Sequence, residues 1–183
     1  MRTFIAVDVT ARDTISKLQY DIISNARWGP RAVKPVEVQN FHFTMIFLGE
    51  VNDVDRIIRK IEELEFEPFT ITYQSIGAFP NSNMAKIIWI GVDKTSEQKL
   101  SNLANNIITK MMEIGFSADK PFSPHMTLFR VKGSPVKADN ILAKYKYRIF
   151  GEDIIDKVHL KKSDLKSSGP TYSNIYTLEA KKL

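Results

Sequence analysis

The sequence predicts an α+β domain made of two pseudo-symmetric lobes, each a small, mostly antiparallel sheet with helices on its outer face, around a central cleft. Two observations lead to this prediction. Short apolar runs typical of strands alternate with amphipathic helical segments. The order strand, helix, loop, strand is read twice, and a His-x-Thr tripeptide stands at a matching place each time. We therefore expect residues 1–183 to be a single bilobed domain with an internal duplication, roughly 1–80 and 81–183.

The first half begins with an apolar run over 4–10 that predicts a strand ending where a helix starts. That helix is expected from four apolar residues at helical spacing before a Gly29-Pro30 stop: Ile15, Leu18, Ile22 and Ala26. A second helix is predicted over about 53–65, with an apolar inner face formed by Val54, Ile57, Ile58, Ile61 and Leu64. Strands over 69–76 and 84–92 flank the turn-rich segment 79–83 and predict a hairpin.

The second half repeats the strand-then-helix order. Thr95 and Gln98 predict a capping box, and an apolar stripe continues to a stop at Gly115. A weaker helix is expected near 136–144. Further strands are predicted over 145–150, 157–162 and 172–179, with Gly169-Pro170 breaking the chain between the last two.

An alignment of the two halves supports the duplication. Placing Val7-Asp8 on Val92-Asp93 gives an offset of 85 residues (92 − 7), and the two His-x-Thr tripeptides are 83 residues apart (125 − 42). A difference of two residues is a small loop change. The alternative is that both segments are merely a strand followed by a helix, which is a common arrangement.

The composition limits the possible classes of protein. The chain has 183 residues, of which 43% are hydrophobic and 26% charged, and its net charge is +5. It has no cysteine, which excludes disulfides and cysteine-based metal sites or nucleophiles. No apolar run approaches the roughly 20 residues of a spanning helix, and the first ten residues are too short and too soon charged for a signal peptide. We expect a cytoplasmic protein without a membrane partner.

The two tripeptides, His42-Phe43-Thr44 and His125-Met126-Thr127, carry a specific chemistry. On a strand, residues i and i+2 share a face, so each tripeptide presents an imidazole beside a hydroxyl. Imidazole moves protons near neutral pH, and a threonine hydroxyl can donate to a phosphate oxygen. Two such pairs facing each other would form a phosphate site with an acid on one side and a base on the other.

Other interpretations of these residues and of the basic stretches remain open. The two histidines could be satisfied core residues or metal ligands, although no convincing third ligand accompanies them. His159 is expected at the surface or at the rim of the cleft, because Val158 and Leu160 alternate with it. The basic stretch with Arg27, Arg31 and Lys34, and the alternation Lys144-Tyr145-Lys146-Tyr147-Arg148, could follow single-stranded RNA or be an exposed strand face.

Beyond these tripeptides, nearly the whole chain resembles the two-histidine (2H) phosphoesterase superfamily, and within it the RNA 2′,3′-cyclic phosphodiesterases, also called the 2′-5′ RNA ligase-like family. The segments that carry the resemblance are 2–8, 40–51, 123–132, 160–166 and 169–172. The resemblance implies metal-independent hydrolysis of RNA 2′,3′-cyclic phosphate ends to 2′-phosphomonoesters without a cofactor. It also implies the possibility of reversible 2′-5′ joining of RNA.

The resemblance also implies roles for single residues. His125 is expected as base and His42 as acid, an order that the sequence does not fix because the site is nearly symmetric. Thr44 and Thr127 would bind the phosphate.

Phe47 and Arg130 each lie five residues after a catalytic histidine, where the family places a base-stacking aromatic and a phosphate-binding arginine. Strict alternation would put both on the opposite face, so they reach the cleft only if the strand ends or bulges there. Tyr172 follows the Gly-Pro pair and is expected at the rim.

The expected partner is RNA with a 2′,3′-cyclic phosphate end, with tRNA fragments among the candidates, and a monomer is expected. Two other functions stay open at this point. One is a phosphodiesterase acting on a small cyclic nucleotide, and the other is a non-catalytic module that binds nucleotides or RNA ends.

Overall fold

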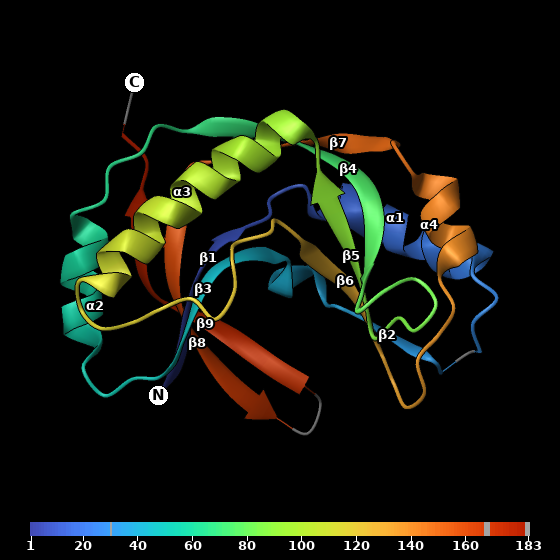
Figure 1. The fold of residues 1–183 in the computed structure, drawn as a ribbon, viewed down its shortest axis with the longest axis horizontal. Helices are drawn as coiled ribbons and strands as arrows, with labels where there is room; N and C mark the ends of the chain where they lie inside the picture. Colours follow the sequence, from blue (N-terminus) through green and yellow to red (C-terminus); the bar gives the residue numbers. More distant parts are fainter. Residues whose placement is uncertain (30, 167–168, 182–183) are drawn as a thin grey trace.

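Two antiparallel sheets form the framework of the computed structural model, which describes residues 1–29, 31–166 and 169–181. One sheet has the strand order β3-β1-β8-β9 and the other β2-β6-β5-β4-β7. The elements in chain order are β1 (Arg2–Asp8), α1 (Arg12–Asn25), β2 (Val33–Pro35), the 3₁₀ turn η1 (Val38–Asn40), β3 (His42–Glu50), α2 (Val54–Glu62), β4 (Phe69–Phe79), β5 (Ile87–Val92), α3 (Lys94–Met112), β6 (Met126–Val131), α4 (Asp139–Tyr145), β7 (Ile149–Ile155), β8 (Lys157–Lys166) and β9 (Gly169–Glu179). The predicted α+β architecture with two sheets is confirmed (Figure 1).

Each sheet contains strands from both parts of the sequence. The pair β1 and β3 is completed by β8 and β9, and the pair β5 and β6 is completed by β2, β4 and β7. Two-stranded ribbons are at best marginally stable in water, so each pair gains by joining strands from elsewhere in the chain. A division near residue 80 therefore does not separate the two sheets, which differs from the expected arrangement of one sheet per half.

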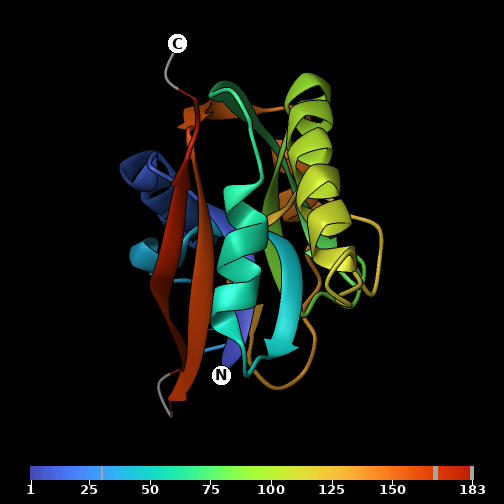
Figure 2. The ribbon, with the colours of Figure 1, turned by 90° about the vertical axis from the view of Figure 1, so that its left-hand side faces the viewer.

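The helices cover the sheets from two ends. α2 and α3 lie together at one end of the molecule and α1 and α4 at the other (Figures 1 and 2). α3 packs against β3 of one sheet and β4 of the other. The predicted apolar stripe makes this contact, and its buried members are Leu100, Leu103, Ala104, Ile107 and Met111.

An aspartate caps the start of both α2 and α3, and for α3 this aspartate takes the place of the predicted Thr95. The Asp53 carboxylate accepts a hydrogen bond from the Arg56 backbone N–H, 3.1 Å away, and the Asp93 carboxylate accepts one from the Ser96 N–H at 2.8 Å. The capping box expected at Thr95 is therefore wrong, since α3 already begins at Lys94. The C-terminal signal is correct: Gly115 lies just beyond the helix with a φ of +86°.

The start of α1 is capped from a distant strand. Ala11, at the N-cap position, offers no side-chain acceptor. Instead the Asp153 carboxylate of β7 accepts from the backbone N–H groups of Thr10 (2.8 Å) and Ala11 (3.0 Å), and from the Tyr73 hydroxyl (2.9 Å). It also accepts from the Thr10 hydroxyl. Burial and the neighbouring Asp153 charge raise the pKa of Tyr73 well above its ordinary value, so its hydroxyl remains a donor.

The strand predicted over 145–150 is wrong. Tyr145 is the last residue of α4, its ring is fully buried, and its hydroxyl donates to Asp21 at 2.5 Å. Tyr147 has a φ of +64° and turns the chain before β7 begins at Ile149. The alternating basic and aromatic residues therefore lie on a helix end and a turn, and do not form one face of a strand.

Candidate active site

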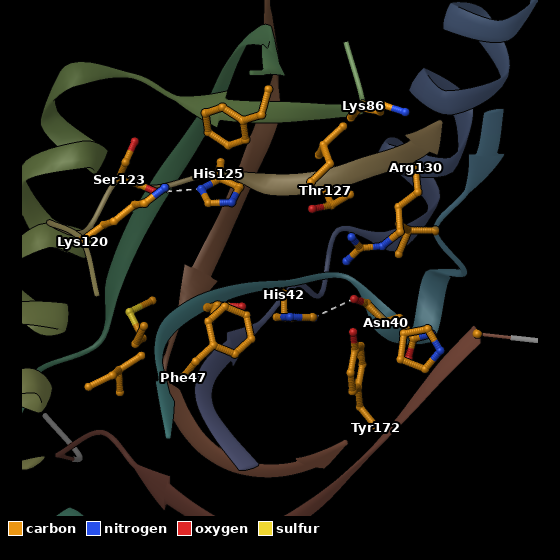
Figure 3. A pocket seen from close by; sticks show the side chains of 18 of the residues that line it. Asn40, His42, Phe47, Lys86, Lys120, Ser123, His125, Thr127, Arg130 and Tyr172 are labelled. Atoms are coloured by element: carbon orange, nitrogen blue, oxygen red, sulfur yellow. Dashed lines mark hydrogen bonds between the residues drawn. The ribbon is translucent and has the colours of Figure 1, made fainter. Parts of the chain in front are cut away.

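A cavity of about 1060 Å³ opens between the two sheets. β3 and β9 supply one wall, and β6, with β2 and the end of β4, supplies the other. All of the predicted site residues line it: His42, Thr44, Phe47, His125, Thr127, Arg130 and Tyr172. Figure 3 places His125 and Thr127 on one wall and His42, Phe47 and Tyr172 on the facing one.

The two histidines are held in the same way. His42 is the first residue of β3, and His125 immediately precedes β6. In each ring Nδ1 lies within hydrogen-bond distance of the carbonyl oxygen two residues earlier, Asn40 at 2.7 Å and Ser123 at 2.8 Å. A carbonyl can only accept, so Nδ1 must carry the hydrogen, and in the neutral ring Nε2 is left with a lone pair. Each histidine therefore has one nitrogen anchored and the other available for proton transfer.

A β-bulge in each histidine strand brings the residue at the fifth position onto the histidine face. In β3, Thr44 lies opposite Ala6 and Phe47 lies opposite Phe4. The chain therefore advances by three residues on β3 over a stretch where it advances by two on β1. In β6, Thr127 lies opposite Trp89 and Arg130 opposite Ile87, with the same irregularity. An extra residue reverses the alternation beyond it. This is why Phe47 and Arg130 reach the cavity although they are an odd number of residues from the histidines.

The register also corrects the alignment of the two halves. Ala6 and Thr44 correspond to Trp89 and Thr127, so both strands are offset by 83 residues (89 − 6 and 127 − 44). The offset of 85 expected for the first strands is therefore wrong by two residues. The two strand pairs then match in the position of the histidine, the threonine and the bulge.

Aromatic rings fix both imidazoles from the side. Phe4 and Tyr172 lie with ring centroids 5.2 Å from that of His42, Tyr172 edge-on. Phe79 lies edge-on to His125 at 4.9 Å, and Trp89 is 6.2 Å away. Phe4, Phe79 and Trp89 were not predicted for the site. These three rings belong to the site because of where they lie relative to the histidine strands, and the sequence does not reveal those positions.

Burial lowers the pKa of His42 to about 4. The hydrogen bond to the Asn40 carbonyl opposes this shift, because it favours the charged ring, and the Lys161 ammonium adds to it. His42 is thus neutral at pH 7 when the cavity holds no anion. An anion close to Nε2 would favour the charged ring and raise this pKa.

Positive charge predominates along the cavity. Lys34, Lys86, Lys120 and Arg130 line it, against the carboxylates of Glu37 and Asp119. Arg130 extends from the His125 wall toward the His42 side (Figure 3), and its charge contributes to lowering the His42 pKa. Such a lining favours an anionic ligand.

His159 and Lys161 lie inside the protein, which overturns the expected surface position of His159. The two residues are 7% and 5% exposed. Lys161 Nζ is 2.8 Å from one Asp8 carboxylate oxygen and 2.6 Å from Asn174 Oδ1. The alternation along β8 predicts one buried and one solvated face, but His159 and Lys161, on the predicted solvated face, are buried with the polar side chains of Asp8, Thr177 and Asn174. His159 does not line the cavity.

Within residues 1–29, 31–166 and 169–181, no group of three or more His, Cys, Asp or Glu side chains is placed to hold a metal ion. Over the same described ranges, none of the helices combines the length and apolar character needed to span a bilayer.

Comparisons with known proteins agree with this geometry. Residues 4–179 match a family model described as the AKAP7 2′5′ RNA ligase-like domain. An RNA 2′,3′-cyclic phosphodiesterase of Archaeoglobus fulgidus is 38% identical over 181 residues, covering 98% of this chain and 100% of the relative. One of Methanocaldococcus jannaschii is 33% identical, with 96% and 98% covered. The crystal structure of TT0787 of Thermus thermophilus has the same fold, with a TM-score of 0.80 at 24% identity, covering 98% of this chain and 97% of that one.

Proposed function

The chain belongs to the AKAP7 2′5′ RNA ligase-like family of the 2H phosphoesterase superfamily, and we propose that it is an RNA 2′,3′-cyclic phosphodiesterase that uses His42 and His125 as an acid–base pair. The relatives named above carry this enzyme's name. The observation that supports the pair is its geometry: two imidazoles in one cavity, each with Nδ1 held by a carbonyl and Nε2 available.

In the proposed reaction, His125 Nε2 takes a proton from water, and the resulting hydroxide attacks the phosphorus. The bond from phosphorus to the 3′ oxygen breaks, and protonated His42 gives its proton to that oxygen. The products are a 2′-phosphomonoester and a free 3′ hydroxyl, with atoms and charge balanced. Each member of a well-placed proton-transfer pair contributes roughly a hundredfold to ten-thousandfold.

The other predicted residues would bind the substrate. The Thr44 and Thr127 hydroxyls would donate to the non-bridging phosphate oxygens, where charge develops in the transition state. Arg130 would add a fixed positive charge. Phe47, a residue that is 64% exposed, would stack on a base, worth roughly 1–3 kcal/mol, and Tyr172 would border the site beside His42.

We expect phosphate binding to prepare His42 for its role as acid. In the free protein its ring should titrate near pH 4, and a bound nucleoside 2′-phosphate should move that titration to higher pH, because the anion favours the charged ring. The measurement is an NMR titration of the ring signals with and without the product, assigned from a His42→Gln variant. An unchanged titration in the saturated protein would contradict the acid role.

Product analysis tests the function itself. We expect an RNA that ends in a 2′,3′-cyclic phosphate to give a 2′-phosphate in the presence of chelator, identified by mass spectrometry and phosphorus NMR. A 3′-phosphate would show that the other bond breaks. Equal turnover of a cyclic mononucleotide would favour the small-nucleotide alternative, and RNA binding without any turnover would favour a non-catalytic module.

Several finer proposals follow from the same site. If a 5′ hydroxyl of a second RNA replaced the water, the same step would form a 2′-5′ phosphodiester, so reversible ligation belongs to the proposal. We further propose tRNA fragments as substrates, a monomeric state, a cytoplasmic location and an origin of the domain by duplication. The matched bulges and carbonyl-anchored histidines support the last of these.

A further inference from the structure

A second cavity of about 550 Å³ is lined by residues at the end of α1 and in α4, and neither histidine lines it. Figure 1 shows these two helices at the same end of the molecule. The lining of the cavity includes three cationic side chains, Arg27, Lys137 and Lys144, and no carboxylate. The side-chain amides of Asn25 and Asn140 also line it. The function proposed above makes no use of this cavity.

The positive charge of this cavity has no ion-pair partner among the described residues, although the Lys144 ammonium lies over the Tyr145 ring, 5.3 Å from its centroid. Among the described residues, no carboxylate forms an ion pair with Arg27, Lys137 or Lys144. Elsewhere the chain does pair its lysines: Lys60 and Lys110 lie 2.7 and 2.8 Å from Glu63. Like charges around one cavity repel each other, and a bound anion would relieve that repulsion.

The cavity wall is firmly attached to the strand that carries Arg130. The Trp28 indole N–H donates to the Lys137 carbonyl at 2.8 Å, and its ring meets Phe129 edge-on, with centroids 6.2 Å apart. Phe129 and Arg130 are neighbours in β6, and Arg130 lines the histidine cavity. β6 therefore lines the histidine cavity with Arg130 and supports Trp28, which lines the second cavity.

Cationic residues also connect the two cavities. Lys34 and Arg130 are paired across β2 and β6 and both line the histidine cavity. Two residues after Arg130 and two residues before Lys34, the Lys132 N–H donates a hydrogen bond to the Ala32 carbonyl at 2.7 Å. Lys132 and Arg31 are exposed at this point, and Arg27 follows at the second cavity. Cationic residues thus lie along the chain between Lys34, which lines the histidine cavity, and Arg27, which lines the second cavity.

We propose that the second cavity binds backbone phosphates of the RNA strand whose cyclic end lies between His42 and His125. This proposal rests on the proposed function, and adds that the substrate is an RNA long enough to reach both cavities. Arginine and lysine suit phosphodiester oxygens, and the two amides can donate to the same groups. Contacts of this kind recognise the backbone and not the sequence, so substrate length would set the affinity.

The test is a length series of RNAs ending in 2′,3′-cyclic phosphate, given to the wild type and to the triple variant Arg27→Ala/Lys137→Ala/Lys144→Ala. For a 24-nucleotide RNA we expect KM to be about tenfold higher in the variant. The slope of the logarithm of the binding constant against the logarithm of the salt concentration should fall by about two, since each phosphate contact contributes roughly 0.7. For a dinucleotide we expect no change. The matched control removes three exposed lysines outside both cavities, Lys94→Ala/Lys99→Ala/Lys157→Ala, and should keep the wild-type KM and slope.

A binding measurement separates this proposal from the proposed function. Fluorescence anisotropy with a labelled 24-nucleotide RNA ending in a 3′-phosphate needs no turnover. Weaker binding by the cavity variant alone would support the second cavity even if the protein hydrolysed nothing. Equal affinity and salt slope in wild type, cavity variant and control would overturn it, as would displacement of the RNA by polyglutamate at equal charge concentration.

Discussion

Replacing either His42 or His125 by alanine is expected to lower kcat by roughly a hundredfold to ten-thousandfold. In the proposed mechanism each ring supplies one proton transfer through Nε2, and alanine leaves the backbone and the second ring in place. Turnover is measured on an RNA with a 2′,3′-cyclic phosphate in the presence of chelator. Affinity for the RNA end should survive, since Thr44, Thr127 and Arg130 are unchanged.

The third histidine provides the control. His159 does not line the cavity, so a His159→Gln variant should retain most of its turnover. Loss of RNA binding together with activity in the His42 or His125 variant would point to a collapsed cavity and contradict the assigned roles.

A sulfur substitution separates acid from base. A substrate with sulfur in place of the bridging 3′ oxygen has a thiolate leaving group, and thiols have pKa values of roughly 8.5, far below those of alcohols. That leaving group needs little help from an acid. We expect the substrate to restore turnover to the His42→Ala variant and not to the His125→Ala variant. The reverse pattern would exchange the two roles.

Replacing Asp153 by alanine is expected to lower the free energy of unfolding by about 3–5 kcal/mol, because several interior donors lose their acceptor at a cost of about 1–3 kcal/mol each. The variant leaves the N–H groups of Thr10 and Ala11 and the Tyr73 hydroxyl without their acceptor in the interior. Urea denaturation measures the loss, and the neighbouring exposed carboxylate gives the control, since Glu152→Ala should change stability by no more than about 0.5 kcal/mol.

A double-mutant cycle keeps this prediction testable if Asp153→Ala does not fold. Asp153→Asn and Tyr73→Phe, alone and combined, should show a coupling energy of about 0.5–3 kcal/mol, because the two side chains are in direct contact. Independent effects of the two changes would mean that the carboxylate does not act through this hydrogen bond.

Local patterns were enough to predict most of the secondary structure. The apolar stripes of α2 and α3 and the hairpin after β4 depend on residues close in sequence, and these predictions are confirmed. The alternation around Tyr147 was misleading, because a positive φ and a buried tyrosine belong to a turn and a helix end.

The residues that line the cavity could be predicted where they belong to the repeated His-x-Thr pattern. The two His-x-Thr tripeptides pointed to one shared site, and the structure places both of them in it. The rings of Phe4 and Phe79 and the buried Lys161 were not predictable, and the bulges after Thr44 and Thr127 could be stated only as a condition for Phe47 and Arg130 to reach the cleft. They depend on which strands become neighbours, which is a property of the assembled sheets and not of any local segment.

The exchange of strands between the two parts of the chain has a consequence for how the molecule comes apart. β4 is made before residue 80 but completes the sheet that holds β6, and β8 is made after it but completes the sheet that holds β3. In a fragment ending near residue 80, β1 would lack its neighbour β8 and β4 would lack β5 and β7, and the remaining fragment would lack the same strand pairings. We expect the walls that face each other across the cavity to melt as one cooperative unit, with neither histidine surviving in a half-folded remnant.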